Sequence, residues 1–169
     1  MKKVIFLCLS IVLIVLLCSC ATLQIASQFT LSKPVVCLTQ PEAYRVYQTN
    51  EDGKCLRNFP IWFYMELQNI TIKEDAMGKH HWTDRYVQIL DFRNIVIFEQ
   101  ETLDVKIYLD PVDGTRPQKI WTWYVILPAH PSLNMYGGEY TIRFKLRDHY
   151  SDVTSETSAD FIIVDGRNI

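Results

Sequence analysis

The chain lacks the residue patterns that usually carry catalysis or metal binding. Only four of its 169 residues are histidine, and no Gly-x-Ser-x-Gly motif is present to expose a serine nucleophile. Adjacent residues of a strand point to opposite faces, so His80 and His81 are not expected to share one ion, and we expect a solvated loop after Gly78. His130 and His149 are isolated and are expected beside turns. The sequence therefore predicts no catalytic residue, no metal site and no cofactor.

A concentrated basic surface is lacking too. The chain has 17 Lys and Arg residues against 19 Asp and Glu residues, and its formal net charge is −2. The first 19 residues contain two of the basic residues and no acidic residue, so residues 20–169 carry −4. Nucleic-acid binding needs clustered positive charge, and the sequence contains no run of like charges, no internal repeat and no low-complexity tract. We therefore expect no nucleic-acid partner, and the length suits one globular domain.

The amino-terminal segment is apolar but short. Lys2 and Lys3 precede a run of fourteen residues from Val4 to Leu17 that is apolar except for Ser10. A permanent transmembrane helix needs about 20 apolar residues, so this run is typical of a signal-peptide core. An uncleaved membrane anchor and an ordinary secretory signal remain the alternatives.

The residues Leu17-Cys18-Ser19-Cys20 resemble the lipobox of bacterial lipoproteins. In that family the leader is cut just before the last cysteine, which receives the lipid. Cys18 departs from the usual Ala, Ser or Thr but is also small. The resemblance implies attachment to the cell membrane or the outer membrane through Cys20, facing the periplasm or the exterior, because two or more acyl chains hold a protein stably. It implies a signal peptide over 1–19, a lipidated tether over 20–30 and a folded domain over 31–169.

Two of the five cysteines remain for the folded domain. Cys8 and Cys18 lie in the expected leader and Cys20 is the expected lipid acceptor, which leaves Cys37 and Cys55. A cysteine pair outside the cytoplasm typically forms a disulfide, and closing this loop would stabilise the fold by about 3 kcal/mol. Two reduced, buried thiols are the alternative, because cell envelopes differ in redox state.

Apolar and polar residues alternate with a period of two through most of residues 31–169. The alternation is clearest from Tyr140 to Arg147, and it recurs over Leu103–Leu109 and Ile61–Leu67. β-branched and aromatic residues, which are enriched in strands, fill these stretches. Further strands are predicted near Leu31 and over Val35–Leu38, Arg85–Leu90, Ile95–Phe98, Ile120–Leu127 and Thr157–Val164. No long amphipathic helix is predicted, and short turns are expected within 40–46 and 130–135.

Turn-forming residues separate the predicted strands. The Asp110–Gly114 segment suits a tight reversal, because proline fixes one turn dihedral and glycine accepts a positive φ. Gly137 and Gly138 precede the strand at Tyr140, and Pro128 blocks extension of the strand before it. About seven to nine strands in a domain of this length predict an all-β fold, namely a single antiparallel β-sandwich.

The stretch from Val105 to Val164 resembles the closing half of the immunoglobulin-like domains of bacterial envelope proteins. It combines the Asp110–Gly114 turn, the tryptophans Trp121 and Trp123 in the next strand, and a strand that begins near Tyr140. Such folds often place a tyrosine at the start of the penultimate strand. The resemblance implies an immunoglobulin-like sandwich and implies no activity by itself.

Aromatic residues supply the one candidate binding face. If the odd-numbered residues of Ile61–Leu67 face the core, then Trp62 and Tyr64 face outwards. In the strand over 120–127, alternation places either the two tryptophans or Tyr124 outside. We take Trp62, Tyr64 and Tyr124 as a candidate surface for a glycan, a peptide or a partner protein. The alternative is that a loop or the first strand covers these side chains.

The sequence as a whole predicts a membrane-anchored envelope lipoprotein. Its β-sandwich is expected to act as a non-catalytic binding or assembly module, with a protein or a glycan of the envelope as partner. One alternative is a structural subunit of a larger envelope complex that docks through a sheet edge or the aromatic surface. The least favoured alternative is an enzyme, which would need a deep pocket that gathers histidines and carboxylates.

Overall fold

A computed structural model describes residues 28–109, 120–131 and 133–165 of the chain. These residues contain no helix, and hence none that could cross a membrane. The strands in this part are β1 (Thr30–Leu31), β2 (Val35–Cys37), β3 (Lys54–Leu56), β4 (Ile61–Gln68), β5 (Lys73–Asp75), β6 (Gly78–Asp91), β7 (Val96–Tyr108), β8 (Ile120–Ile126), β9 (Gly138–Asp148) and β10 (Val153–Val164). The expected signal peptide over 1–19, Cys20 and the Asp110–Gly114 turn lie outside the described residues.

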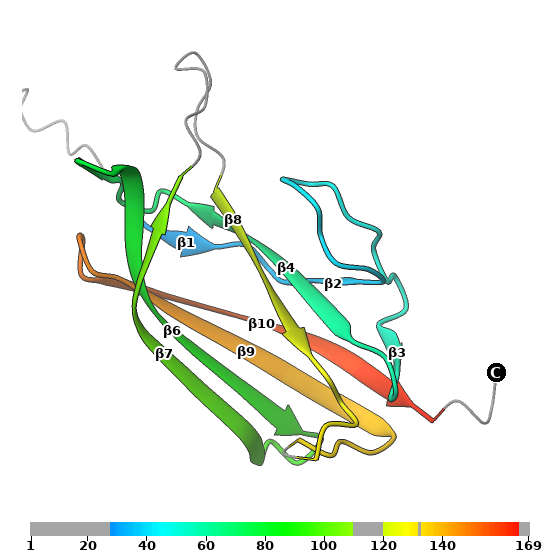
Figure 1. Cartoon of the computed structure of the whole chain (residues 1–169). Helices are drawn as coiled ribbons and strands as arrows, with labels where there is room; N and C mark the ends of the chain where they lie inside the picture. The colour runs from blue at the N-terminus through cyan, green and yellow to red at the C-terminus, as the bar shows by residue number, and fades with distance from the viewer. Residues whose placement is uncertain (1–27, 110–119, 132, 166–169) are drawn as a thin grey trace, which may run out of the picture.

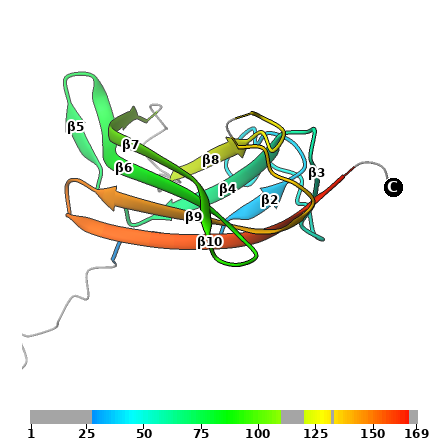
Figure 2. The same ribbon diagram turned by 90° about the horizontal axis from the view of Figure 1, so that it is seen from below.

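The strands form two sheets, which confirms the predicted all-β class. β4 is central to the four-stranded sheet, with β8 along one side and β1 and β2 along the other. In the six-stranded sheet, the strands β3, β10, β9 and β6 lie side by side in that order. β7 pairs with the other side of β6, and β5 pairs with the first residues of β6. Figure 1 shows the order of the strands. In Figure 2, β9 and β10 lie in one layer and β8, β4 and β2 in the other.

The core lies between the two layers. The odd-numbered residues of β4 from Ile61 to Leu67 are all buried, as predicted. Phe63 is 0% exposed, and its ring centroid lies 5.9 Å from that of Phe144 in β9 and 5.4 Å from that of Phe161 in β10. Full burial of one such side chain contributes about 1.5–3 kcal/mol, so these rings hold the sheets together.

Two details differ from the predicted sandwich. β3 pairs in parallel with β10, with Cys55 opposite Ile163, so the prediction of a purely antiparallel sandwich is wrong at this edge. The described residues contain ten strands rather than seven to nine, because the three-residue strands β3 and β5 are added. β5 consists of three charged residues and β3 has a single buried one, so neither shows the apolar alternation that marks a strand.

The long β6–β7 hairpin was predicted only in pieces. The strand expected at Arg85–Leu90 extends over the whole of β6, and the two strands expected within 95–109 are one strand, β7. Asp91 closes the turn, because its carboxylate accepts hydrogen bonds from the backbone N–H groups of Arg93 and Ile95 at 2.9 and 3.0 Å. β7 forms one edge of its sheet.

Candidate functional site

Three tryptophans lie on the outer face of the four-stranded sheet. The β4–β8 register sets Trp62 opposite Val125 and Glu66 opposite Trp121, so these residues share one face. Trp62 and Trp123 meet edge to face, with ring centroids 5.1 Å apart and an interplanar angle of 67°. Trp123 is 39% exposed. We call Trp62, Trp121 and Trp123 the tryptophan face.

Residues 38–49, which we call the cover segment, lie over part of the same face. The ring of Tyr47 contacts the ring of Tyr64 at a centroid distance of 4.4 Å. The backbone N–H of Arg45 donates to the Tyr64 hydroxyl at 3.1 Å, and Trp121 stacks on the Tyr64 ring at 5.6 Å. Tyr64 is therefore only 1% exposed, and burial raises the pKa of Tyr64 to about 12.

Glu66 on β4 fixes the cover segment in place. Arg45 donates from Nε and Nη2 to the two oxygens of Glu66, at 2.6 and 3.1 Å, and the hydroxyl of Tyr44 donates to the same carboxylate at 3.1 Å. A bidentate pair between a guanidinium and a carboxylate fixes the orientation of the two side chains as well as their distance. This bond raises the pKa of Arg45.

An open groove of about 560 Å³ separates the cover segment from the tryptophans. Indole rings offer flat apolar faces, while hydroxyl, amide and carboxylate groups can orient a ligand by hydrogen bonds. The groove combines both kinds of contact. The lining residues are Thr39, Gln40, Pro41, Glu42, Trp121 and Trp123.

Two of the three residues predicted for the binding face are not on an exposed surface. Tyr64 points outward from β4, but the cover segment encloses it, which is the alternative the sequence left open. Tyr124 pairs with Phe63 and faces the core, where its ring lies 5.7 Å from the ring of Phe144. Only Trp62 keeps its predicted place. The alternation of β8 is compatible with either of its faces pointing outwards. The register with β4 shows that the face that carries the tryptophans is the outer one.

Cys37 of β2 and Cys55 of β3 belong to different sheets but line one cavity of about 880 Å³. Both are buried free thiols in this structure, and burial raises the pKa of each to about 11. Asn50 connects their surroundings: its backbone N–H donates to the Val36 carbonyl and its side-chain amide to the Lys54 carbonyl, both at 2.8 Å. The disulfide between the two cysteines stays a prediction.

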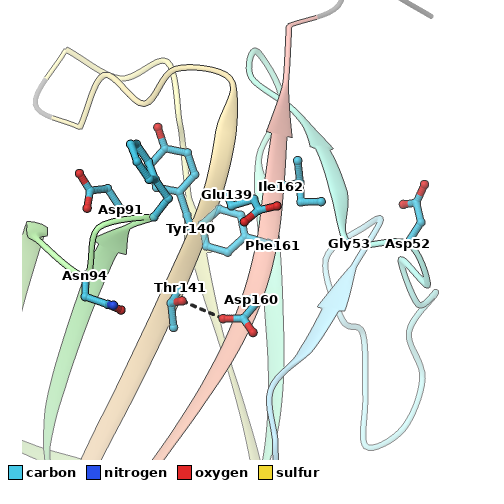
Figure 3. A pocket seen from close by; sticks show the side chains of 11 residues that line it. Asp52, Gly53, Asp91, Asn94, Glu139, Tyr140, Thr141, Asp160, Phe161 and Ile162 are labelled. Atoms are coloured by element: carbon cyan, nitrogen blue, oxygen red, sulfur yellow. Dashed lines mark hydrogen bonds between the residues drawn. The ribbon is translucent and has the colours of Figure 1, made fainter.

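A third hollow, of about 470 Å³, is rich in carboxylates (Figure 3). Thr141 donates to Asp160 at 2.7 Å, and Arg93 pairs with Asp91 at 2.7 Å. No three metal-ligating groups of the described residues come together in this hollow. Its lining is nevertheless rich in acidic side chains. The acidic residues that line it are Asp52, Asp91, Glu139 and Asp160.

The histidine pair lies in β6 and not in a solvated loop, so that prediction is wrong. His80 and His81 are each 2% exposed, because the strand begins at Gly78 and runs through both. His80 Nε2 forms a short hydrogen bond with the hydroxyl of Tyr150. Nδ1 of His81 has no hydrogen-bond partner in the described part of the chain, and burial lowers the pKa of His81 from 6.5 to about 4.

The sheet also assembles a group of residues that the sequence did not reveal. Asp84 on β6, Asp104 on β7 and His149 after β9 each bring one potential ligand atom to within 4.8 Å of the others. Asp84 and His149 are 65 positions apart, so no local motif marks them. His149 lies in the turn after β9, as predicted, but it is not isolated, because it contacts two carboxylates.

Comparison with known proteins indicates no family. No protein-family model matches the sequence, and no curated protein matches it. Among solved structures, the chain is similar to one described as the crystal structure of the C-terminal domain of wzt. The TM-score is 0.45 at 6% sequence identity, over 82% of this chain and 76% of that chain. A likeness this remote carries no inference about function.

Proposed function

We propose that this chain is a lipid-anchored protein of the bacterial envelope whose β-sandwich is a non-catalytic binding module. The resemblance of residues 17–20 to a lipobox supports an anchor at Cys20, on the cell membrane or the outer membrane and facing the periplasm or the exterior. The binding role rests on the tryptophan face beside the cover-segment groove. Solvent-accessible tryptophans in a groove are typical of interaction sites, where they supply much of the binding energy.

The partner in this proposal is a glycan or a protein of the envelope. Among the described residues that line the groove, Glu42 is the only charged one, so these residues offer no cation to pair with an acidic ligand. Flat indole faces pack against sugar rings or against apolar side chains, and Thr39 and Gln40 supply hydrogen bonds.

We propose further that the sandwich is of the immunoglobulin-like type. Tyr140 lies near the start of β9, the penultimate strand. Its hydroxyl donates to the backbone carbonyl of Tyr136 at 2.9 Å and accepts from the backbone N–H of Tyr136 at 3.2 Å. Immunoglobulin-like folds often carry a tyrosine near the start of this strand whose hydroxyl bonds to backbone a few residues upstream, and this similarity supports the proposal.

The predicted disulfide also belongs to this proposal. Cys37 and Cys55 would exchange with the disulfide of an envelope oxidoreductase: the two thiols lose two electrons and two protons, and the disulfide of that enzyme is reduced to two thiols. The new bond would connect the edge strands β2 and β3 and so join the two sheets.

The binding role is tested with isolated envelopes from cells that lack the protein. The full chain and a variant with Trp121→Ala and Trp123→Ala are incubated with these envelopes, and the bound fraction is measured. The proposal expects the variant to lose binding. Phe92→Ala, which removes an exposed aromatic ring at the β6–β7 turn, is the control and should bind like the parent.

Treatment of the envelopes separates the two partner classes. Protease treatment should abolish binding if the partner is a protein, and periodate oxidation should abolish it if the partner is a glycan. Equal binding of the tryptophan variant and the parent to untreated envelopes would refute a binding role for this face.

A second candidate function, a structural subunit of a larger envelope complex, is favoured by β7. Within the described residues, β7 pairs with β6 alone, and its other edge presents unpaired backbone groups over thirteen residues. Val96, Ile97 and Leu103 are exposed on this strand. A subunit that assembles through this edge would migrate in a large complex after mild detergent extraction, and Ile97→Lys would release it. A tryptophan-face binder would be unaffected by that substitution.

A further inference from the structure

A β-bulge brings two carboxylates together on the outer face of the six-stranded sheet. The β6–β7 register shifts between Thr83 and Arg85, so that Leu103 and Asp104 together lie opposite Asp84. Asp104 adopts a φ of 56°, and its backbone N–H donates to Asp84 Oδ1 at 3.0 Å. Bulges of this kind re-aim a side chain away from the regular alternation. The Asp104 carboxylate is thereby set beside the Asp84 carboxylate.

His149 reaches the same point from the other side of β6. Its backbone N–H donates to the Trp82 carbonyl at 3.0 Å, and its ring stacks on the Trp82 indole with centroids 4.2 Å apart and planes inclined by 10°. These two contacts fix the imidazole. Its Nε2 lies 2.7 Å from Asp84 Oδ1 and 3.8 Å from Asp104 Oδ1. One nitrogen therefore faces two carboxylate oxygens, although a neutral imidazole nitrogen can donate only one hydrogen.

The spacing of these three atoms is close to that of a metal site. Ligand atoms that share a tetrahedral Zn²⁺ at about 2.0–2.1 Å lie about 3.4 Å from one another. The separation of 2.7 Å between His149 Nε2 and Asp84 Oδ1 would open by about 0.7 Å, and the separation of 3.8 Å to Asp104 would close by about 0.4 Å. Both adjustments are small side-chain rotations.

The surrounding charges leave room for a cation. Arg147 approaches the other oxygen of Asp84, with Nη1 3.8 Å from Oδ2, and its closer partner is Asp152 at 2.6 Å. The guanidinium therefore lies on the Oδ2 side of the Asp84 carboxylate, while Oδ1 faces His149. The two carboxylates place negative charge on the open side of the group, which attracts a positive ion.

We propose that Asp84 Oδ1, Asp104 Oδ1 and His149 Nε2 bind one divalent transition-metal ion such as Zn²⁺. An imidazole nitrogen together with carboxylate oxygens suits Zn²⁺, whereas Ca²⁺ and Mg²⁺ take oxygen ligands. The Asp84 side chain is 6% exposed and that of Asp104 is 74% exposed, so a fourth position opens to solvent and takes a water molecule. The ion joins β6, β7 and the end of β9, and this site is independent of the tryptophan face on the other sheet.

The test is a calorimetric titration of the metal-free full chain with Zn²⁺ alone, with thermal unfolding as a second measurement. One ion should bind per chain and should raise the unfolding temperature, because an ion that binds only the folded state stabilises it. Asp104→Asn and His149→Gln should each weaken Zn²⁺ binding by about 10-fold to 100-fold or more. Loss of a residue that only supports a metal ligand already has an effect of that size, and these two residues are ligands themselves.

Asp152→Asn is the matched control. It removes an exposed carboxylate from the same Arg147 but contributes none of the three ligand atoms, so the affinity for Zn²⁺ should stay within about twofold of the parent. Asp104 is exposed, so Asp104→Asn should keep the fold, which circular dichroism of the metal-free variant checks. Absence of saturable one-to-one binding by the parent overturns the proposal. So do equal affinities of Asp104→Asn and the parent, and tighter binding of Ca²⁺ than of Zn²⁺.

Discussion

The ring of Tyr47 lies on the ring of Tyr64, with centroids 4.4 Å apart and planes inclined by 36°. This contact joins the cover segment to β4. Glu66, two residues further along the same strand, holds Arg45 and Tyr44 of the segment. The cover segment is thus attached at two neighbouring points of one strand, and the groove beside the tryptophans depends on both.

Glu66→Gln should loosen the cover segment. The substitution keeps the shape of the side chain but removes the charge that binds Arg45. Because Arg45 is largely exposed and solvent screens the pair, the loss of stability should be small. Amide hydrogen exchange over 44–48 should become faster. Glu156→Gln, which breaks an exposed pair with Arg143 on the other sheet, should leave exchange in the cover segment unchanged. Unchanged protection in Glu66→Gln would contradict the role given to this carboxylate.

Two phenylalanines at opposite extremes of exposure test the core. Phe63→Ala should lower the free energy of unfolding by about 3–5 kcal/mol, because it removes a ring that is 0% exposed between the two sheets. Phe92→Ala, at a side chain that is 73% exposed, should change it by about 0.5 kcal/mol or less. Chemical denaturation measures both. Similar losses in the two variants would show that the sheets do not pack as described.

His81 should make the fold sensitive to mild acid. Burial lowers its pKa from 6.5 to about 4, so between these pH values the unfolded chain binds a proton that the folded chain does not. The free energy of unfolding is therefore unaffected by this group above pH 6.5 and falls as the pH drops towards 4, by about 3 kcal/mol in all. His81→Gln should remove this step from the pH profile. If the free energy of unfolding falls with pH equally in the parent and in His81→Gln, a group other than His81 causes the fall.

Asp148 affects the stability of the fold at lower pH than His81 does, so the two contributions can be measured separately. Burial opposes ionisation of this carboxyl, but hydrogen bonds from Thr71 and Ser151 outweigh it, so the pKa of Asp148 lies below 3.8. Its contribution to stability is present above pH 3.8 and is lost as the pH falls through the lowered pKa.

The cysteine pair has a measurable signature in each redox state. If Cys37 and Cys55 are bridged, non-reducing peptide mapping recovers one linked peptide, and reduction lowers the free energy of unfolding by about 3 kcal/mol. Cys37→Ala should then be insensitive to the reductant. If both are thiols, their pKa of about 11 keeps them protonated, and iodoacetamide modifies them only after denaturation. If Cys37 and Cys55 are both alkylated in denatured, unreduced protein from the envelope, the prediction of a disulfide is refuted.

Alternation was enough to predict the all-β class and the inner face of β4. It succeeded because Ile61–Leu67 has one apolar face and one mixed face, so only one side can be buried. It failed where a contact between distant segments decides the outcome. The burial of Tyr64 depends on the cover segment, and the inward direction of Tyr124 depends on the β4–β8 register, neither of which is encoded locally.

The cluster of Asp84, Asp104 and His149 was invisible for a related reason. Its residues lie on or after three different strands, and a bulge sets the direction of Asp104. A single sequence offers no signal for a bulge at a non-glycine residue. The same holds for the burial of His80 and His81, since β6 begins at a glycine, which is typical of a loop.

The most direct test of the account is the state of Cys20 in bacterial cells. Mass spectrometry of the amino-terminal peptide, together with membrane fractionation, is applied to the parent chain and to Cys20→Ser. The account predicts that the parent begins at an acylated Cys20 and partitions into detergent with the membranes, while Cys20→Ser carries no lipid and leaves them. Processing and membrane attachment of Cys20→Ser that match the parent would contradict it.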